Sequence, residues 1–346
     1  MNQTESRKNE HIRISLDEDV SSHASYWDDV QLTHNALPEI NKDELDLSTK
    51  LFEKKLGAPL IIAAMTGGYK KAKKINENLA IAAEKYQIGM GVGSQRAALE
   101  KPELTDTYSI VKEYDIPLRF ANIGASQLVA WGCKKSIDYA NKMIDMIDAQ
   151  AFVVCLNFLQ ELIQLEGEAN AKGCLDAIKS LAEDLDVPVI VKESGAGISH
   201  DVAQRLSKTK VAGIDVGGAG GTSFAAIEHF RAKLMGDKLH ERGGKTFWNW
   251  GIPTPVSIVE SGEATEWKVP IIATGGIRNG LDVAKALALG ASCAGVARKV
   301  LRPATVGKNE VIYEIDAIIK ELRATMFLTG TDKISKMSDV GAELWI

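Results

Sequence analysis

The stretch ATGGIRNGLDVAKALALGASCAGVARKVL, residues 273–301, carries the pattern that decides the fold. It begins inside the apolar run Pro270–Thr274, and a second apolar run follows at Ser292–Ala297. Between them, Leu281–Leu289 has the apolar spacing of an amphipathic helix. Short apolar runs that alternate with helices are typical of strands buried on both faces of a parallel sheet. The stretch therefore predicts a strand–helix–strand unit of an α/β fold.

The same alternation extends over most of the chain and predicts eight strands. The apolar runs are Pro59–Ala64, Ile88–Val92, Leu118–Ile123, Ala151–Leu156, Pro188–Lys192, Ala212–Val216, Pro270–Thr274 and Ser292–Ala297. Further helical patterns lie at Lys73–Tyr86, Ser136–Ile147 and Gly173–Leu185. Eight repeats favour a closed (β/α)8 TIM barrel, although the alternation alone also fits an open doubly wound sheet.

Three segments do not follow the repeat. Residues 1–58 form a polar N-terminal arm and extension before the barrel, which we assign to residues 59–328. Residues 329–346 are a C-terminal tail, either frayed or docked on a neighbouring subunit. Residues 228–254 are a long insertion between the sixth and seventh strands, with the aromatic residues Phe247, Trp248 and Trp250. An insertion at this end of a barrel strand predicts a lid, and a packed surface excursion is the alternative.

Composition excludes several classes of protein. The 346 residues are 45% hydrophobic and 25% charged, values of a globular chain. A net charge of −5 disfavours nucleic-acid binding. No apolar run reaches the roughly 20 residues that cross a membrane, and no secretion signal is visible at the N-terminus. Four scattered cysteines without a CxxC motif argue against disulfides and zinc, and favour a reducing cytoplasm.

The ends of the seventh and eighth strands predict a phosphate site. Strand seven runs into Gly275, Gly276, Ile277 and Arg278, and strand eight runs into Ala297-Arg298. Glycine lets backbone N–H groups approach an anion closely, and a following helix start adds the positive end of its dipole. The loops after these two strands are also the usual phosphate site of barrels. The alternative is a pair of structural turns with solvated arginines.

Other strand ends predict that the phosphate belongs to FMN. A flat ring across the barrel mouth would meet Met65, Thr66 and Gly67 after strand one, Asn122 after strand three, Lys192 after strand five and Thr222 after strand six. A lysine there stabilises negative charge on the ring. Each residue also has a structural alternative: a salt bridge for Lys192, a loop cap for Asn122 and a helix N-cap for Thr222.

A second anion site and a metal are suggested more weakly by three polar clusters. Arg7, Lys8 and His11 lie on the arm, Ser94, Gln95 and Arg96 follow strand two, and Gln160-Glu161 follow strand four. A diphosphate needs several cationic donors and commonly a Mg²⁺ held by one or two carboxylates. Solvated charge on the arm and an ordinary helix start at Gln160 are the alternatives.

Together these motifs resemble one family, the type 2, flavin-dependent isopentenyl-diphosphate Δ-isomerases. The resemblance covers most of the chain and rests on order and spacing. Its motifs are RKNEH (7–11), MTGG (65–68), GVGSQR (91–96), LNFLQE (156–161), VKESG (191–195), DVGGAGGTSFAAIE (215–228), WGIPT (250–254) and ATGGIR (273–278). One departure is Cys155, where the family pattern usually has histidine before LN.

The resemblance implies a role for each matching residue. Substrate diphosphate contacts fall to Arg7, Lys8, Ser94, Gln95 and Arg96, with Asn157 and Gln160 beside the substrate, His11 close to it and Glu161 on Mg²⁺. Contacts to FMN fall to Met65, Thr66, Gly67, Ser94, Asn122, Lys192, Thr222, Gly275, Gly276, Ile277, Arg278, Ala297 and Arg298. The family also implies NADPH as the reductant of FMN and a homo-oligomer, a tetramer or octamer.

The implied reaction converts isopentenyl diphosphate into dimethylallyl diphosphate by moving a double bond. Such a shift needs an acid, a base and the exclusion of water. We hypothesise that reduced flavin is the main acid and base, that Lys192 tunes it and Gln160 orients the substrate, and that Trp248 or Trp250 walls off the apolar end unless both are core.

Two other functions compete with this reaction. An FMN-dependent 2-hydroxy-acid oxidoreductase needs a His/Arg pair at the mouth, which the glycine-rich turn 217–222 lacks, since His229 and Arg231 come later in an expected helix. A non-catalytic flavin-binding or regulatory subunit is the second alternative.

Overall fold

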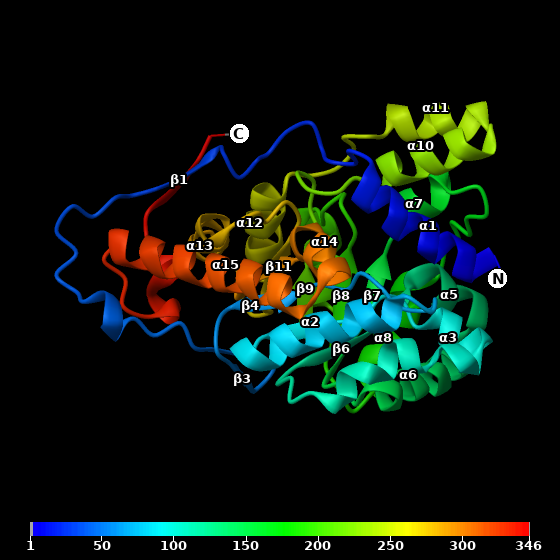
Figure 1. The fold of residues 1–346 in the computed structure, drawn as a ribbon, viewed down its shortest axis with the longest axis horizontal. Coiled ribbons are helices and arrows are strands. Elements are labelled where there is room, and N and C mark those ends of the chain that lie inside the picture. The colour runs from blue at the N-terminus through cyan, green and yellow to red at the C-terminus, as the bar shows by residue number, and fades with distance from the viewer. Residues whose placement is uncertain (1–2, 346) are drawn as a thin grey trace.

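The eight predicted strands form one closed parallel barrel in a computed structural model that describes residues 3–345 (Figure 1). The strands are β4 (Leu60–Ile62), β5 (Gly89–Gly91), β6 (Arg119–Gly124), β7 (Ala151–Leu156), β8 (Val189–Glu193), β9 (Gly213–Asp215), β10 (Ile271–Thr274) and β11 (Cys293–Val296). The last strand pairs with the first, so that Ala294 lies opposite Leu60. This closure confirms the barrel and rejects the open sheet.

Helices surround the barrel and bury the apolar faces that the sequence pattern indicates. In α2 (Ala72–Tyr86), for example, Ile75, Leu79, Ala82 and Ala83 are all buried. The other helices are α3 (Arg96–Glu100), α4 (Asp106–Ser109), α5 (Ala125–Trp131), α6 (Cys133–Ile147), α7 (Phe158–Ile163), α8 (Cys174–Asp184), α9 (His200–Ser207), α12 (Thr254–Ala264), α13 (Gly280–Ala288), α14 (Arg298–Val306) and α15 (Lys308–Leu328). No helix among residues 3–345 is long and apolar enough to cross a membrane.

A hairpin in the N-terminal extension closes the amino end of the barrel. Its strands are β2 (Thr49–Leu51) and β3 (Lys54–Leu56), and its turn carries Phe52. Leu51 and Leu56 are buried in a cluster with residues of the barrel interior, and Phe52 packs on the same cluster. Because this end is filled, the open end of the barrel is the carboxyl end of its strands.

The arm and the tail are both ordered by contacts within the chain. The arm is a helix, α1 (Gln3–Asp17), and it lies at the same end of the molecule as α10 (Phe224–Met235) (Figure 1). The tail forms β12 (Ala342–Leu344), which pairs antiparallel with β1 (Val30–Leu32) of the N-terminal extension. Backbone pairing within one chain thus holds the tail, which the sequence left either frayed or docked on another subunit.

The predicted insertion forms a helical hairpin whose first helix begins earlier than expected. Helix α10 (Phe224–Met235) starts four residues before position 228, and α11 (Lys238–Thr246) packs against it. Ser223 caps α10, because its hydroxyl accepts a hydrogen bond from the N–H of Ala226 at 3.1 Å. Thr222 is therefore not the N-cap.

Candidate functional site

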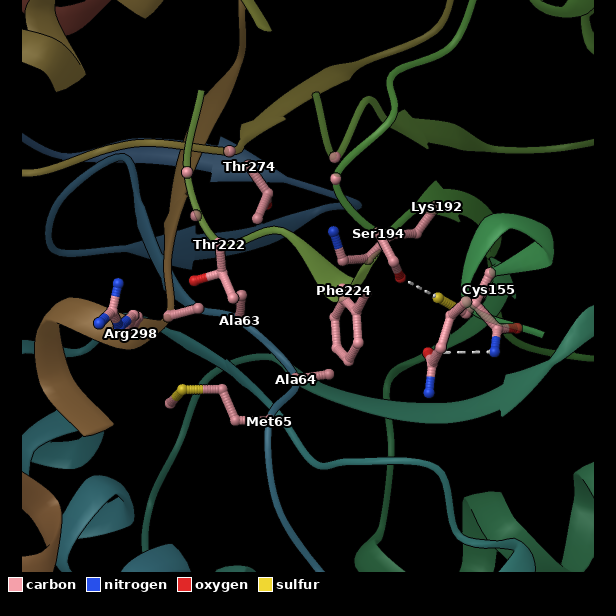
Figure 2. Close-up of a pocket in the computed structure, with 18 of the residues that line it drawn as sticks. Ala63, Ala64, Met65, Cys155, Lys192, Ser194, Thr222, Phe224, Thr274 and Arg298 are labelled. Carbon is pink, nitrogen blue, oxygen red and sulfur yellow. Dashed lines mark hydrogen bonds between the residues drawn. The ribbon is translucent and has the colours of Figure 1, made fainter. Parts of the chain in front are cut away.

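A cavity of about 610 Å³ opens at the carboxyl ends of the barrel strands, and the segments after all eight strands contribute to its wall. Figure 2 shows the wall from Ala63 through Cys155 to Arg298, with the ring of Phe224 projecting into the middle. The predicted residues that line it are Arg7, Lys8, His11, Met65, Ser94, Arg96, Asn122, Asn157, Gln160, Glu161, Lys192, Thr222, Gly275, Gly276, Ile277, Arg278, Ala297 and Arg298.

Glycine turns line one end of this cavity. Gly276 has a φ of +71°, and a Cβ atom there would lie 2.6 Å from the carbonyl oxygen of Gly220. Only glycine allows this approach of the two loops. The backbone N–H groups of Gly275, Gly276 and Ile277 have no acceptor among the described residues, and α14 begins at Arg298. These donors suit a phosphate group.

The two predicted phosphate arginines are already engaged by the protein. Arg278 binds Asp28 through both terminal nitrogens, at 2.7 and 3.1 Å, and also binds Asp282. The hydrogen bonds that Arg278 donates to Asp282, and to a smaller extent those to Asp28, raise the pKa of the guanidinium. Arg298 donates to the Ser21 hydroxyl at 2.6 Å. At this end of the cavity, the hydrogen-bond donors left free for a phosphate are therefore backbone N–H groups. The two arginines add positive charge nearby.

A buried acceptor without a partner lies in the middle of the cavity wall. The Oδ1 atom of Asn122 has no hydrogen-bond partner among the described residues, while its Nδ2 donates to Val92 at 3.4 Å. An unsatisfied buried acceptor costs about 1–3 kcal/mol. An N–H group at the edge of a flavin ring would satisfy it, so this atom fits the predicted cofactor.

Lys192 is held at the end of β8 by a buried network. Its ammonium lies 3.2 Å from Asp215 and donates to the Glu193 carbonyl at 2.9 Å. The Thr274 hydroxyl donates to the same Asp215 oxygen at 3.0 Å. Burial raises the pKa of Asp215, although Lys192 acts to lower it. The predicted salt bridge of Lys192 exists, and Lys192 also lines the cavity. The salt bridge therefore does not rule out a contact between Lys192 and a bound flavin.

Cys155 and Ser194 form a neutral pair in the cavity wall (Figure 2). Their sulfur and oxygen atoms lie 2.8 Å apart. Burial raises the pKa of Cys155 to about 11, although Lys192 and the hydrogen bond to Ser194 act to lower it. The side chain is thus a thiol at neutral pH and supplies neither the charge nor the basicity of an imidazole.

Helix α1 brings cationic side chains to the cavity. Lys8 donates to the Ser94 carbonyl at 2.6 Å and to the Tyr108 hydroxyl at 3.0 Å. Burial, reinforced by neighbouring Arg7, lowers the pKa of Lys8 to about 7 against a small opposite effect of Glu100. A buried amine with a lowered pKa favours an anionic ligand, which would restore its charge.

A buried ionic network, which the sequence did not reveal, fastens α1 to α10. Arg231 is 3% exposed and pairs with Glu228 at 2.7 Å and with Glu10 and Glu166 at 3.0 Å each. His11 lies 2.7 Å from the other oxygen of Glu228. The residues come from three separate stretches of the chain, so no local motif could have identified the cluster.

Glu161 lines the cavity from the first turn of α7. Its carboxylate accepts hydrogen bonds from Asn157 at 3.0 Å, Gln164 at 3.1 Å and the Glu168 N–H at 2.9 Å. No group of three or more acidic, histidine or cysteine residues that could hold a metal occurs between residues 3 and 345. One carboxylate is sufficient for a Mg²⁺ that keeps several waters and binds substrate phosphates.

Three predicted contacts lie outside the cavity wall. Gln95 is completely buried beneath it, where its amide donates to the Met143 carbonyl at 2.8 Å and accepts the Asn122 N–H at 3.1 Å. Its side chain therefore supports Asn122 and does not line the cavity, and its contact with a diphosphate stays a prediction. The Thr66 carbonyl accepts the Gly93 N–H at 2.9 Å, and a Cβ on Gly67 would meet the Tyr108 ring. Both serve packing.

The aromatic wall also differs from the prediction. Trp248 and Trp250 do not line the cavity, whereas Phe224 does. Trp248 packs partly buried against Phe230, and Trp250 is 61% exposed. Phe224 stands directly after a cap residue that follows the glycine-rich turn, and this position is the signal that could have identified it.

Comparisons with known proteins identify the family of the chain. The family described as FMN-dependent dehydrogenase matches residues 149–342. The isopentenyl-diphosphate delta-isomerase of Thermoplasma volcanium is 47% identical over 335 residues, which cover 96% of this chain and 94% of that protein. The protein of the same name from Methanosarcina mazei is 44% identical over 341 residues, which cover 97% of this chain and 91% of that protein. A solved mandelate oxidase with a difluorinated hydroxy acid has a TM-score of 0.67 at 17% identity, over 99% of this chain and 98% of that one, a likeness of fold alone.

Proposed function

Because the chain belongs to the isopentenyl-diphosphate delta-isomerase family, we propose that it converts isopentenyl diphosphate into dimethylallyl diphosphate by a 1,3-allylic proton shift. The observation that carries this proposal is a single cavity whose wall has a part suited to a flavin and a part suited to an anionic substrate. Unpaired backbone donors and a free acceptor at Asn122 suit a flavin, and the cations of α1 face the same space. A cofactor and an anionic substrate would thus lie together.

FMN is the cofactor that the matched family and the cavity support. The donors of Gly275–Ile277 would hold its phosphate, Asn122 would meet the ring edge, and Lys192 would stabilise negative charge on the ring. Reduced FMN supplies a group that gives and takes a proton in a reaction without net redox change. We propose NADPH as the physiological reductant.

The chain's own residues bind and shield the substrate. Arg7, Lys8, Ser94 and Arg96 line the part of the cavity below α1, and we assign the diphosphate to them. His11 is held by Glu228 at 2.7 Å and helps to position α1. Gln160 and Phe224 line the cavity where the five-carbon chain would lie, and the neutral Cys155 thiol adds no base there. An apolar, water-poor wall protects a carbocation-like transition state from hydration.

We assign Mg²⁺ to Glu161, which lines the cavity beside Asn157 and Gln160. The amide of Asn157 orients the carboxylate at 3.0 Å. Replacing Glu161 by Gln removes the negative charge, so half-maximal activity should need about 10- to 100-fold more Mg²⁺. Titration of activity with Mg²⁺ tests this, with Glu183→Gln, at an exposed glutamate of α8, as the control. An unchanged Mg²⁺ requirement in Glu161→Gln would contradict the assignment.

An oxidoreductase that acts on 2-hydroxy acids is less well supported, despite the likeness of fold to mandelate oxidase. That chemistry needs a free His/Arg pair at the mouth of the barrel. Here His229 binds the Glu241 carbonyl at 2.7 Å, and Arg231 is saturated by three carboxylates. Neither residue lines the cavity.

The decisive experiment is anaerobic incubation of the FMN-loaded protein with Mg²⁺ and isopentenyl diphosphate. We expect NMR to show dimethylallyl diphosphate when dithionite or NADPH is added, and none when the flavin stays oxidised. Lactate or mandelate as substrate tests the oxidoreductase, through bleaching of the flavin absorbance. Flavin binding without any turnover would favour a non-catalytic subunit.

Two further properties are proposed from the family resemblance. We propose a homo-oligomer, a tetramer or octamer, and light scattering on the purified protein would test this. Exposed apolar side chains on the α10–α11 hairpin, Leu234 and Leu239, are suitable for a subunit contact. We also propose a cytoplasmic location, which the free thiols of Cys133, Cys155, Cys174 and Cys293 support.

A further inference from the structure

A segment of the N-terminal extension crosses the glycine-turn end of the cavity. We call residues Val20–Trp27 the strap. Ser21, Ser22, Ala24 and Ser25 line the cavity together with the turns that follow β9, β10 and β11. No barrel strand supplies the strap, so the roles assigned to strand ends do not include it.

The strap is anchored at both ends and irregular between them. Val20 is fully buried in a small cluster with Ile14 and Ile227. At the other end, buried Trp27 donates from its indole N–H to the Gly275 carbonyl at 2.9 Å, and Lys285 donates to the Trp27 carbonyl at 2.7 Å. Residues 21–26 are partly or fully exposed and have no helix or strand beyond one bridge. Such a segment opens locally more easily than the barrel.

Main-chain bonds lay the strap directly on the glycine-rich turn after β9. The Ser22 N–H donates to the Gly221 carbonyl at 2.7 Å, and the Ser223 N–H donates to the Val20 carbonyl at 2.8 Å. Ser21 and Thr222 form an isolated antiparallel bridge. A group lying against Thr222 inside the cavity is therefore covered by the strap.

The predicted phosphate arginines join the strap to the other two turns. Arg298, after β11, donates to the Ser21 hydroxyl at 2.6 Å. Arg278, after β10, binds Asp28, the residue next to Trp27, at 2.7 Å. Their engagement explains why the guanidinium groups have little capacity left for a ligand of their own.

The insertion holds the strap from outside. The Trp248 indole N–H donates to the Ser21 carbonyl at 2.8 Å. The Asn249 side chain accepts the His23 N–H at 2.9 Å, and the rings of His23 and Trp248 stack with centroids 5.4 Å apart. Trp248 and Asn249 of the insertion thus contact the strap and do not line the cavity. The strap, and not the predicted lid, is the segment that lies next to the cavity at this point.

We propose that the strap binds the phosphate end of FMN through its serine hydroxyls and that its opening limits the rate at which the cofactor leaves. This inference rests on the proposed function, because it takes FMN as the ligand. The buried Ser25 hydroxyl supports it: Ser25 lines the cavity, and its Oγ makes no hydrogen bond of standard geometry among the described residues, although it is near enough to Asp28 to help lower the pKa of that carboxyl. A phosphate oxygen would accept from it.

The strap predicts separate effects on release and on affinity. Asn249→Ala removes a contact outside the cavity, so FMN dissociation, followed by the recovery of free-flavin fluorescence, should become about tenfold faster, as expected for one or two lost hydrogen bonds. Trp248→Phe keeps an aromatic ring and loses only the indole N–H, so it should accelerate FMN release less than Asn249→Ala does. Ser25→Ala should weaken FMN about tenfold and leave riboflavin, which lacks the phosphate, unaffected. Asn41→Ala, at an exposed distant asparagine, is the control.

The outcomes separate the strap from the proposed function. If FMN leaves Asn249→Ala and Trp248→Phe at the unmodified rate, the strap does not limit release. If Ser25→Ala weakens FMN and riboflavin equally, the serine does not bind phosphate. Failure of the unmodified protein to bind FMN at all would overturn the proposed function instead. Circular dichroism confirms in each case that the variant is folded.

Discussion

The two ends of the cavity are built from different materials. The end proposed for the cofactor consists mainly of backbone, where glycine turns after β9 and β10 approach closely and leave N–H groups free. The substrate end consists of charged side chains on α1, held by the buried partners Glu228 and Arg231. A backbone site is specified by local sequence and should tolerate the removal of side chains that do not contact the ligand, whereas a side chain proposed to bind the phosphate directly, such as Ser25, is an exception. A side-chain site depends on partners far along the chain, so single substitutions should damage it selectively.

The largest effect on this comparison is expected from Arg231→Met. The substitution leaves Glu10, Glu166 and Glu228 without their shared cation, and an unpaired buried charge costs about 3–5 kcal/mol. Chemical denaturation should show this loss of stability, while the folded variant keeps its FMN affinity. The control is Arg205→Met on exposed α9. If both variants have the same free energy of unfolding, the ionic network around Arg231 does not stabilise the position of α1.

Lys8→Ala should give the next largest effect. Its ammonium faces the proposed diphosphate, and a lost charge-assisted bond costs about 2–3 kcal/mol, or roughly 30- to 150-fold in substrate affinity. Isothermal titration with isopentenyl diphosphate measures this, and flavin fluorescence measures the FMN affinity, which should stay the same. Loss of FMN instead would show that α1 supports the cofactor end, and the two ends would no longer be separable.

A smaller effect is a pH dependence that comes from the same lysine. Burial lowers the pKa of Lys8 to about 7 in the free protein, and a bound diphosphate raises it again because it stabilises the ammonium form. Affinity through Lys8 is therefore fully present below pH 7 and is lost as the pH rises above it, at most about tenfold per pH unit. Lys8→Ala should lack this slope, whereas ionisation of the substrate affects both proteins. Identical pH profiles would reject the lowered pKa.

Much of the fold, including the glycine turns at the open end of the barrel, could be predicted because these signals are local. A strand buried on both faces needs an apolar run, and each of the eight runs became a barrel strand. The turn at Gly275-Gly276 has to be glycine for steric reasons, so it is visible in the sequence. The roles proposed for individual residues still await the experiments above.

The remaining features depend on contacts between distant segments. Gln95 stands within a motif that predicted diphosphate binding, yet its side-chain amide donates to the Met143 carbonyl at 2.8 Å and does not line the cavity. The expectation that Trp248 walls off the cavity failed, because its indole binds the Ser21 carbonyl, 227 residues away. Such pairings carry no periodic or local signal.

The sequence by itself determined the barrel and the position of its glycine turns, because burial and backbone sterics act on neighbouring residues. Only the tertiary structure decided which charged groups surround Arg231, which acceptor at Asn122 stays free, and that the strap covers the cavity. Hydrogen bonds and ion pairs form between whichever groups the closed barrel brings within about 3 Å of each other, and that proximity exists only after folding.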